Sequence, residues 1–190
     1  YLELTGAPYV PPKWAFGFQQ SRWSYPDESS IREVARRFRD HQIPCDAIYM
    51  DIDYMDHFKV FEVDRRRFPD LAGFVREMKS LGFKLVPIVD PGVKIEKGYR
   101  IYEEGRKAEY FCLDEKGRDF VAACWPGVVH FPDFYRPEVR RWWGEQYCPW
   151  VEMGIAGFWN DMNEPSIFYT PDALHKVLLA AARYKDFNAY

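Results

Sequence analysis

Late in the chain the sequence reads Phe158-Trp159-Asn160-Asp161-Met162-Asn163-Glu164-Pro165-Ser166. The apolar run that ends at Trp159 is typical of a buried strand, and the polar residues and Pro165 that follow cannot continue one. Asp161 is therefore expected at the carboxyl end of a buried strand, where barrel enzymes hold their catalytic groups. Trp159 lies two residues earlier, so both side chains leave the same face. An aromatic ring beside a fixed carboxylate suits a sugar that develops positive charge.

The same alternation of strand and helix patterns runs through the rest of the chain. Residue patterning predicts strands over 14–20, 47–52, 83–89 and 155–159, the middle two ending on acids as the last one does. Strands and helices that alternate this regularly form parallel sheets with right-handed crossovers. Strands that end on acids favour a barrel, although an open doubly wound sheet also fits the pattern.

Four helices are predicted from apolar residues at helical spacing. Asp27 is the expected N-cap of the first, Gly82 follows the second, Pro137 begins the third and Pro149 kinks or ends it. The inward faces are Ile31, Val34, Ala35 and Phe38; Leu71, Phe74, Val75, Met78 and Leu81; Val139, Trp142, Trp143 and Tyr147; and Leu174, Val177, Leu178 and Ala181.

The chain has 190 residues, whereas a complete (β/α)8 TIM barrel needs about 250. We therefore expect an α/β fold that contains only about the first four βα units of such a barrel. Residues 1–13 are interpreted as a linker into the barrel and residues 14–190 as the partial barrel. The first residue is Tyr1 rather than Met, which also favours a piece of a longer protein.

Residues 92–136 interrupt the alternation and are too aromatic for a disordered loop. They predict an insertion on the barrel rim, with a hairpin formed by 110–113 and 120–124. The hairpin would present Trp125-Pro126-Gly127. Trp125 either forms a wall for a sugar or folds back onto the hairpin, and composition alone slightly favours the second alternative.

Charge and cysteine content narrow the possible partners. A net charge of −3, with Arg65-Arg66-Arg67 as the main basic cluster, argues against nucleic acid. No apolar run is long enough to span a membrane, and no secretion signal is visible. Cys45, Cys112, Cys124 and Cys148 lack metal-binding spacing, so neither a metal nor a cofactor is expected. Separate thiols weakly favour a reducing, cytoplasmic location.

Asp51-Ile52-Asp53 ends the second predicted strand and allows more than one interpretation. Residues two apart on a strand point to the same side, so the two carboxylates could hold a divalent metal, as in Asp-x-Asp glycosyltransferases. That three-residue pattern arises often by chance, and no Gly-rich nucleotide loop follows the early strands. Alternatively, both acids only cap backbone amides at the strand end.

Several motifs together resemble glycoside hydrolase family 31, the retaining α-glucosidases, and are similar to glucosidase II. They are Gln20-Ser21-Arg22-Trp23, Asp51-Ile52-Asp53-Tyr54-Met55, Val89-Asp90-Pro91, Cys124-Trp125-Pro126-Gly127, Phe131-Pro132-Asp133-Phe134 and the passage from Trp159 to Glu164. The resemblance runs from about Thr5 to Ser166. It implies hydrolysis of terminal α-linked glucose from α-glucoside oligosaccharides by double displacement.

The resemblance also implies roles for individual residues. Asp161 would be the nucleophile and Glu164 would support it. The substrate pocket would include Asp51, Ile52, Ile88, Asp90, Trp125, Trp159 and Met162. Asp51 and Asp90 in place of the residues of related α-xylosidases imply a hexose substrate.

The family's acid/base residue comes from strands beyond this passage, so the rest of the barrel and an amino-terminal β-sandwich are expected elsewhere in a longer chain. Residues 1–190 would then supply the nucleophile half of the site. The alternatives are a sugar-binding half-barrel without catalysis and an inert fragment.

Overall fold

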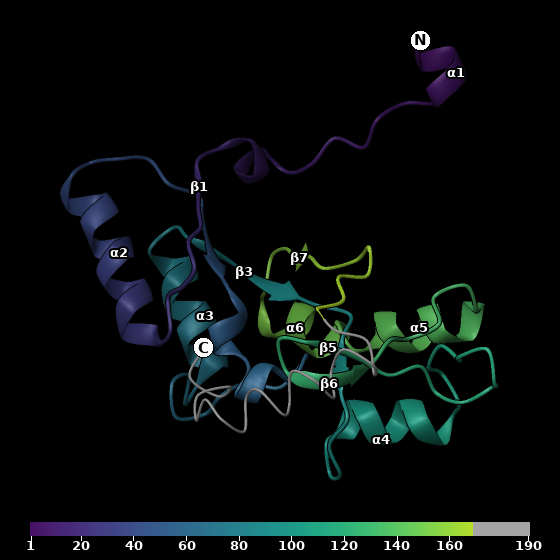
Figure 1. Ribbon diagram of the computed structural model, residues 1–190. Helices are drawn as coiled ribbons and strands as arrows, with labels where there is room; N and C mark the ends of the chain where they lie inside the picture. The colour runs from purple at the N-terminus through teal and green to yellow at the C-terminus, as the bar shows by residue number, and fades with distance from the viewer. Residues whose placement is uncertain (169–190) are drawn as a thin grey trace.

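A four-stranded parallel sheet forms the centre of the fold (Figure 1). The structure, a computed structural model, describes residues 1–168. The strands are β1 (Gln19–Gln20), β2 (Ala47–Met50), β3 (Lys84–Val89) and β7 (Trp159–Asn160), and they lie side by side in that order. In the register, Ile48 lies opposite Leu85, and Ile88 opposite Trp159. This parallel half-barrel confirms the predicted partial (β/α)8 fold.

The first two predicted helices are present, and the first begins where the sequence predicts. Helix α2 (Glu28–Asp40) starts at Asp27, whose Oδ1 accepts a hydrogen bond of 2.8 Å from the Ser30 amide. Helix α3 (Leu71–Ser80) starts at Asp70, which caps the Gly73 amide in the same way at 2.9 Å. Both helices lie on the same side of the strands (Figure 1).

The first predicted strand, 14–20, is mostly wrong. Residues Lys13–Phe16 form the 3-10 helix η1, and the strand begins only at Gln19. Gln19 pairs with Ala47, the first residue of β2, so within the described chain the preceding residues have no neighbouring strand to pair with. Phe16 and Phe18 alternate as in a strand, yet they are 70% and 52% exposed. The alternation therefore did not reflect a buried face.

The ends of the second and third predicted helices lie close to the expected positions, but Leu81 is not on a buried helical face. Gly82 has a φ of +83° and follows α3 as predicted, but Leu81 is 48% exposed because the helix has already ended there. Pro149 does end the third helix: α5 (Pro137–Glu145) stops before it, and α6 (Cys148–Met153) begins around it. The last predicted helix, with Leu174, lies outside the described residues.

The insertion contains more regular structure than predicted. A three-stranded antiparallel sheet has the order β4 (Val93–Lys94), β6 (Gly127–His130), β5 (Ala122–Cys124), and helix α4 (Arg100–Lys107) was not predicted. Of the predicted pairing of 110–113 with 120–124, the structure has one backbone hydrogen bond of 2.7 Å, from the Phe120 amide to the Cys112 carbonyl, and an adjacent bridge between Leu113 and Asp119. Residues 122–124 instead pair with 127–130, because Gly127, at a φ of +95°, lets the chain turn tightly after Trp125-Pro126.

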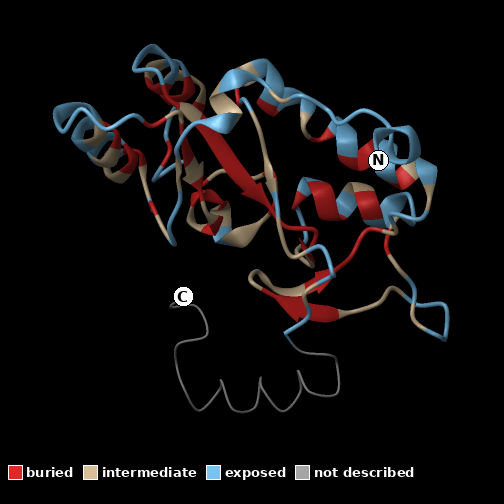
Figure 2. Ribbon diagram, turned by 90° about the horizontal axis from the view of Figure 1, so that it is seen from above, coloured by how far each residue is buried: buried red, intermediate tan, exposed pale blue. Residues whose placement is uncertain are grey.

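The core lies between the sheet and the helices that cover it (Figure 2). Buried strand residues Ile48, Met50 and Ile88 pack against Phe74 and Met78 of α3 and against neighbouring elements. The short helix α1 (Leu2–Thr5) and the residues after it are exposed. Within residues 1–168, no helix combines the length and apolar character needed to cross a bilayer.

Candidate active site

Three strands of the half-barrel end on acids at the same edge of the sheet. Asp51 directly follows β2, Asp90 directly follows β3, and Asp161 directly follows β7. The Asp161 amide donates a hydrogen bond of 3.2 Å to the Val89 carbonyl, which joins the ends of two of these strands. Asp51 and Asp161 both act electrostatically on Asp90. The carboxylates that the sequence placed at strand ends are thus brought together.

Asp51 is half-buried and turns the chain out of the sheet. It is the N-cap of the 3-10 helix η2 (Ile52–Tyr54), and its Oδ1 accepts a hydrogen bond of 2.7 Å from the Ile52 amide. Burial raises the pKa of Asp51, the Ile52 amide opposes this, and the charges of Asp53 and Asp161 add to the rise.

The expectation that Asp51 and Asp53 point to one side of a strand is wrong. The strand ends at Met50, and a 3-10 turn begins at Ile52, so strand geometry does not relate the two carboxylates. Asp53 accepts a hydrogen bond of 3.1 Å from Trp23 Nε1, and the charges of Asp53 and Asp161 both act on Asp51. Within residues 1–168, His, Cys, Asp and Glu form no cluster suited to a metal ion.

Asp90 is the most deeply buried of the three acids. It is 5% exposed, and its Oδ1 has no hydrogen-bond partner among the residues that the structure describes. Burial, reinforced by the charges of Asp161 and Asp51, raises the pKa of Asp90 to about 7. Near neutral pH Asp90 is therefore protonated part of the time, and the cluster carries less than three full negative charges.

The elevated pKa of Asp90 leads to a prediction about stability. The folded chain holds this proton more tightly than the unfolded chain, whose carboxyl has an ordinary pKa of 3.8. The resulting stability is fully present below pH 4 and is lost as the pH rises through 7. Asp90→Asn removes the charge, so its free energy of unfolding should exceed that of the parent at pH 8, on the order of a few kcal/mol, and match it near pH 4.

Urea unfolding of residues 1–190 at several pH values measures this difference. Asp114→Asn is the matched control, because Arg118 lowers the pKa of Asp114 to about 2 and the charge there is favourable. That control should not gain stability at pH 8. Parallel pH profiles for the parent and Asp90→Asn would contradict the assignment.

Glu164 is exposed and its carboxylate accepts a hydrogen bond of 2.8 Å from Ser166 Oγ. Its own backbone amide and then Ser166 lower its pKa. In the described part of the chain, no hydrogen bond joins Glu164 to Asp161. Its supporting role therefore stays a prediction.

The predicted apolar site residues occupy different depths. Trp159 is half-buried on a face where, with Gly17, Gln19, Ser21 and Tyr49, it lines a hollow of about 520 Å³. Ile52 and Ile88 are only 3% and 2% exposed and belong to the hydrophobic core. Met162 contacts the second core cluster, formed by Ala122, Cys124, Val129 and Phe131. Contact of these residues with a substrate stays a prediction.

Trp125 lies in the turn between β5 and β6 and is half-buried. Its ring centroid is 5.6 Å from that of Trp23 and 4.9 Å from that of Phe168. It therefore joins a group of rings rather than standing alone. Trp23 was not predicted as a site residue, although it follows β1 much as the acids follow their strands. That position was the signal that could have identified it.

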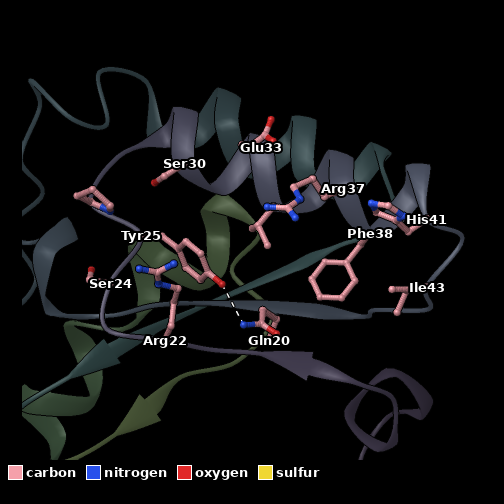
Figure 3. Close-up of a pocket in the computed structure, with 12 residues that line it drawn as sticks. Gln20, Arg22, Ser24, Tyr25, Ser30, Glu33, Arg37, Phe38, His41 and Ile43 are labelled. Atoms are coloured by element: carbon pink, nitrogen blue, oxygen red, sulfur yellow. Dashed lines mark hydrogen bonds between the residues drawn. The ribbon is translucent and has the colours of Figure 1, made fainter.

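A second hollow, of about 570 Å³, lies between β1 and α2 and holds none of the three acids (Figure 3). Phe38 and Ile43 contribute apolar surface to it, and Gln20 Nε2 donates to Tyr25 Oη at 3.0 Å. In residues 1–168, β1 pairs only with β2, so this hollow follows an open edge of the sheet. It does not coincide with the acidic site.

Comparisons with known proteins agree with this geometry. α-Glucosidase 2 of Bacillus thermoamyloliquefaciens is 49% identical over 168 residues, which cover 88% of this chain and 21% of that protein. A crystal structure of the glucosidase II α subunit superposes with a TM-score of 0.83 at 32% identity, over 90% of this chain and 19% of that one. The family 31 α-glucosidase of Bacteroides thetaiotaomicron gives 0.80 at 40% identity, over 90% and 29%.

The chain thus spans about a fifth of the length of the curated relatives that it matches. Residues 8–190 match the domain described as the glycosyl hydrolases family 31 TIM-barrel domain. With the parallel half-barrel and the acids at its strand ends, this match shows that the chain belongs to glycosyl hydrolase family 31.

Proposed function

We propose that this chain supplies the nucleophile half of the active site of a retaining α-glucosidase, within a longer polypeptide. The observation that carries the proposal is the position of Asp161 at the end of β7, beside Asp51 and Asp90 at the neighbouring strand ends. The substrate class follows from the relatives, which are named as α-glucosidases. The rest of the barrel and an amino-terminal β-sandwich are expected to complete the enzyme.

The chemistry is a double displacement. Asp161 attacks the anomeric carbon and forms a glycosyl ester, while an acid outside the described residues protonates the departing oxygen. The same group then removes a proton from water, which attacks the anomeric carbon and releases Asp161. Two inversions leave glucose with its original anomeric configuration.

The acids of the cluster need different protonation states for this reaction. The nucleophile Asp161 must be ionised. Asp90, with its pKa near 7, holds a proton part of the time, which reduces charge repulsion around Asp161 and lets Asp90 donate a hydrogen bond to a sugar hydroxyl. Asp51 uses one oxygen on the Ile52 amide and keeps acceptor capacity for a hydroxyl.

Covalent trapping tests the proposed nucleophile. A fluorinated α-glucosyl donor that forms the ester quickly and releases it slowly should label the longer enzyme in a one-to-one ratio. Mass spectrometry of the digested protein should place the label on the peptide that contains Asp161. A label on Asp51 or Asp90 would refute the assignment, and hydrolysis with no label at all would favour another mechanism.

Substrate preference provides a separate prediction. If Asp51 and Asp90 bind hexose hydroxyls, the enzyme should prefer α-glucosides over α-xylosides. Asp51→Asn should then lower kcat/KM for α-glucosides about ten- to a hundredfold, because a hydrogen bond to a charged group contributes about 1.5–3 kcal/mol. Asp40→Asn, which changes an exposed acid paired with Arg36, is the control and should leave kcat/KM unchanged. Equal parental rates on glucosides and xylosides would contradict the proposed hexose specificity.

A further inference from the structure

The described residues include a hydrogen-bonded acid and indole at the mouth of the half-barrel that the proposed chemistry does not use. Trp23 follows β1 and is 57% exposed, so packing alone restrains its ring only weakly. Its Nε1 donates a hydrogen bond of 3.1 Å to Asp53 Oδ2. This bond crosses from the loop after β1 to the 3-10 turn after β2, and it fixes the direction of the indole plane.

Asp53 is itself held in place from the opposite side. Arg67 Nη1 donates to the Asp53 carbonyl at 3.1 Å and lies 3.7 Å from Asp53 Oδ1. Arg67 also lies 3.6 Å from Asp64, a buried acid. The two carboxylate oxygens of Asp53 therefore have separate partners, with Oδ1 toward Arg67 and Oδ2 toward Trp23. Such a carboxylate is a rigid support for the indole.

The supported ring faces the other aromatic residues of the mouth. The centroids of Trp23 and Trp125 are 5.6 Å apart at 54°, and Trp125 contacts Phe168 edge-on at 4.9 Å. Phe168 is attached to β5 through its amide, which donates to the Ala123 carbonyl at 2.9 Å. The aromatic wall, meaning Trp23, Trp125 and Phe168, thus joins the barrel loops to the insertion. The flat apolar faces of these rings are suited to contact with the apolar face of a sugar.

We propose that Asp53 is a positioning residue that holds the indole of Trp23 against Trp125 and so sets the affinity for the sugar next to the hydrolysed glucose. The inference rests on the proposed α-glucosidase function. Asp51 and Asp53 then have different roles within one short turn. Asp51 belongs to the acids around the cleaved bond, and Asp53 orients the aromatic wall beside those acids. Asp53 acts through Trp23 and does not itself touch the reacting atoms.

Two substrates separate this role from a general effect on catalysis. Maltose carries a second sugar that would contact the wall, whereas α-glucosyl fluoride has a leaving group too small to reach it. In the longer enzyme, Asp53→Ala should raise KM for maltose roughly three- to tenfold, the range expected for one lost hydrogen bond. It should leave kcat for maltose and both constants for α-glucosyl fluoride within twofold.

Conservative variants test the hydrogen bond itself. Asp53→Asn keeps an acceptor for the indole but loses the charge facing Arg67, so it should restore most of the maltose KM. Trp23→Phe keeps a ring without the N–H and should reproduce the effect of Asp53→Ala. The double variant Trp23→Phe/Asp53→Ala should be no worse than either single one, because both remove the same bond. Asp40→Ala, an exposed acid paired only with Arg36 in the described structure, is the unaffected control.

Each contrary result has a distinct meaning. Equal rises in KM for both substrates, or additive single effects, would show that Asp53 only stabilises the turn with Arg67, and the inference would be wrong. Asp53→Asn behaving like Asp53→Ala would overturn the inference in the same way. If the parent enzyme hydrolyses neither substrate, the proposed function fails and this inference fails with it.

Discussion

Asp161→Ala in the longer enzyme is expected to lower turnover of α-glucosides by a factor on the order of 10⁴–10⁶, the loss seen when a hydrolase loses a group of its nucleophilic machinery. The loss should appear in kcat and in kcat/KM together, because Asp161 forms a bond that exists only along the reaction path. Steady-state kinetics with maltose and with an activated α-glucosyl donor measure both constants.

The same variant should remain folded. Asp161 is half-buried at the mouth and outside the packed core, and its charge opposes ionisation of Asp90. Its removal should therefore lower the pKa of Asp90 and leave the melting temperature unchanged or higher. Added azide should restore part of the turnover of an activated donor and release β-glucosyl azide, since the small anion can attack where the carboxylate stood. Unaltered turnover would exclude Asp161 as the nucleophile.

Residues 1–190 alone are expected to show no measurable hydrolysis of maltose. A sugar is a poor leaving group, and the general acid that protonates it is commonly responsible for about 10²–10⁴-fold of the rate. The resemblance places that acid beyond this chain. An activated aryl α-glucoside needs little protonation, so slow labelling of Asp161 by such a donor is compatible with a folded half-site. Glucose release from maltose, compared with release by the longer enzyme, tests this expectation.

The isolated chain should also self-associate. Within residues 1–168, β1 and β7 each have one open edge, and the apolar side chains of Phe16, Phe18 and Ile43 are 70%, 52% and 49% exposed near the β1 edge. Unpaired strand edges pair readily with other chains. Size-exclusion chromatography with light scattering should give a mass above the 22.6 kDa of one chain. A monomer that steadily hydrolyses maltose would contradict both expectations and would make Asp90, with its pKa near 7, the first candidate acid.

Asp90 and Asp51 show how burial and hydrogen bonding act differently on the pKa values of similar residues in one site. Asp90 is buried without a hydrogen-bond partner in the described chain, and its pKa rises to about 7. Asp51 is less buried and bonds to the Ile52 amide, which opposes the rise in its pKa. Depth and backbone contacts, rather than residue type, therefore set the pKa values of these two proposed hydroxyl-binding groups.

Local patterns were sufficient to predict the architecture. The first and third predicted helices begin after Asp27 and at Pro137, because capping and proline geometry act within one helical turn. The runs 47–50 and 84–89 form strands because their apolar side chains are buried on both faces of a parallel sheet. The convergence of Asp51, Asp90 and Asp161 also followed from the sequence, since the carboxyl ends of neighbouring parallel strands meet at one edge.

Features that depend on partners distant in the sequence could not be predicted in this way. Residues 14–18 alternate like a strand but form none, because β2 begins opposite Gln19. Residues 122–124 pair with the segment after them rather than before them, and Asp53 lies in a 3-10 turn where it contacts Trp23 and Arg67. The pKa of Asp90 likewise depends on burial by elements far along the chain. Hydrogen-bond partners, burial and electrostatic neighbours are set by the packed fold, whereas periodicity and capping are set by residues within a few positions of one another.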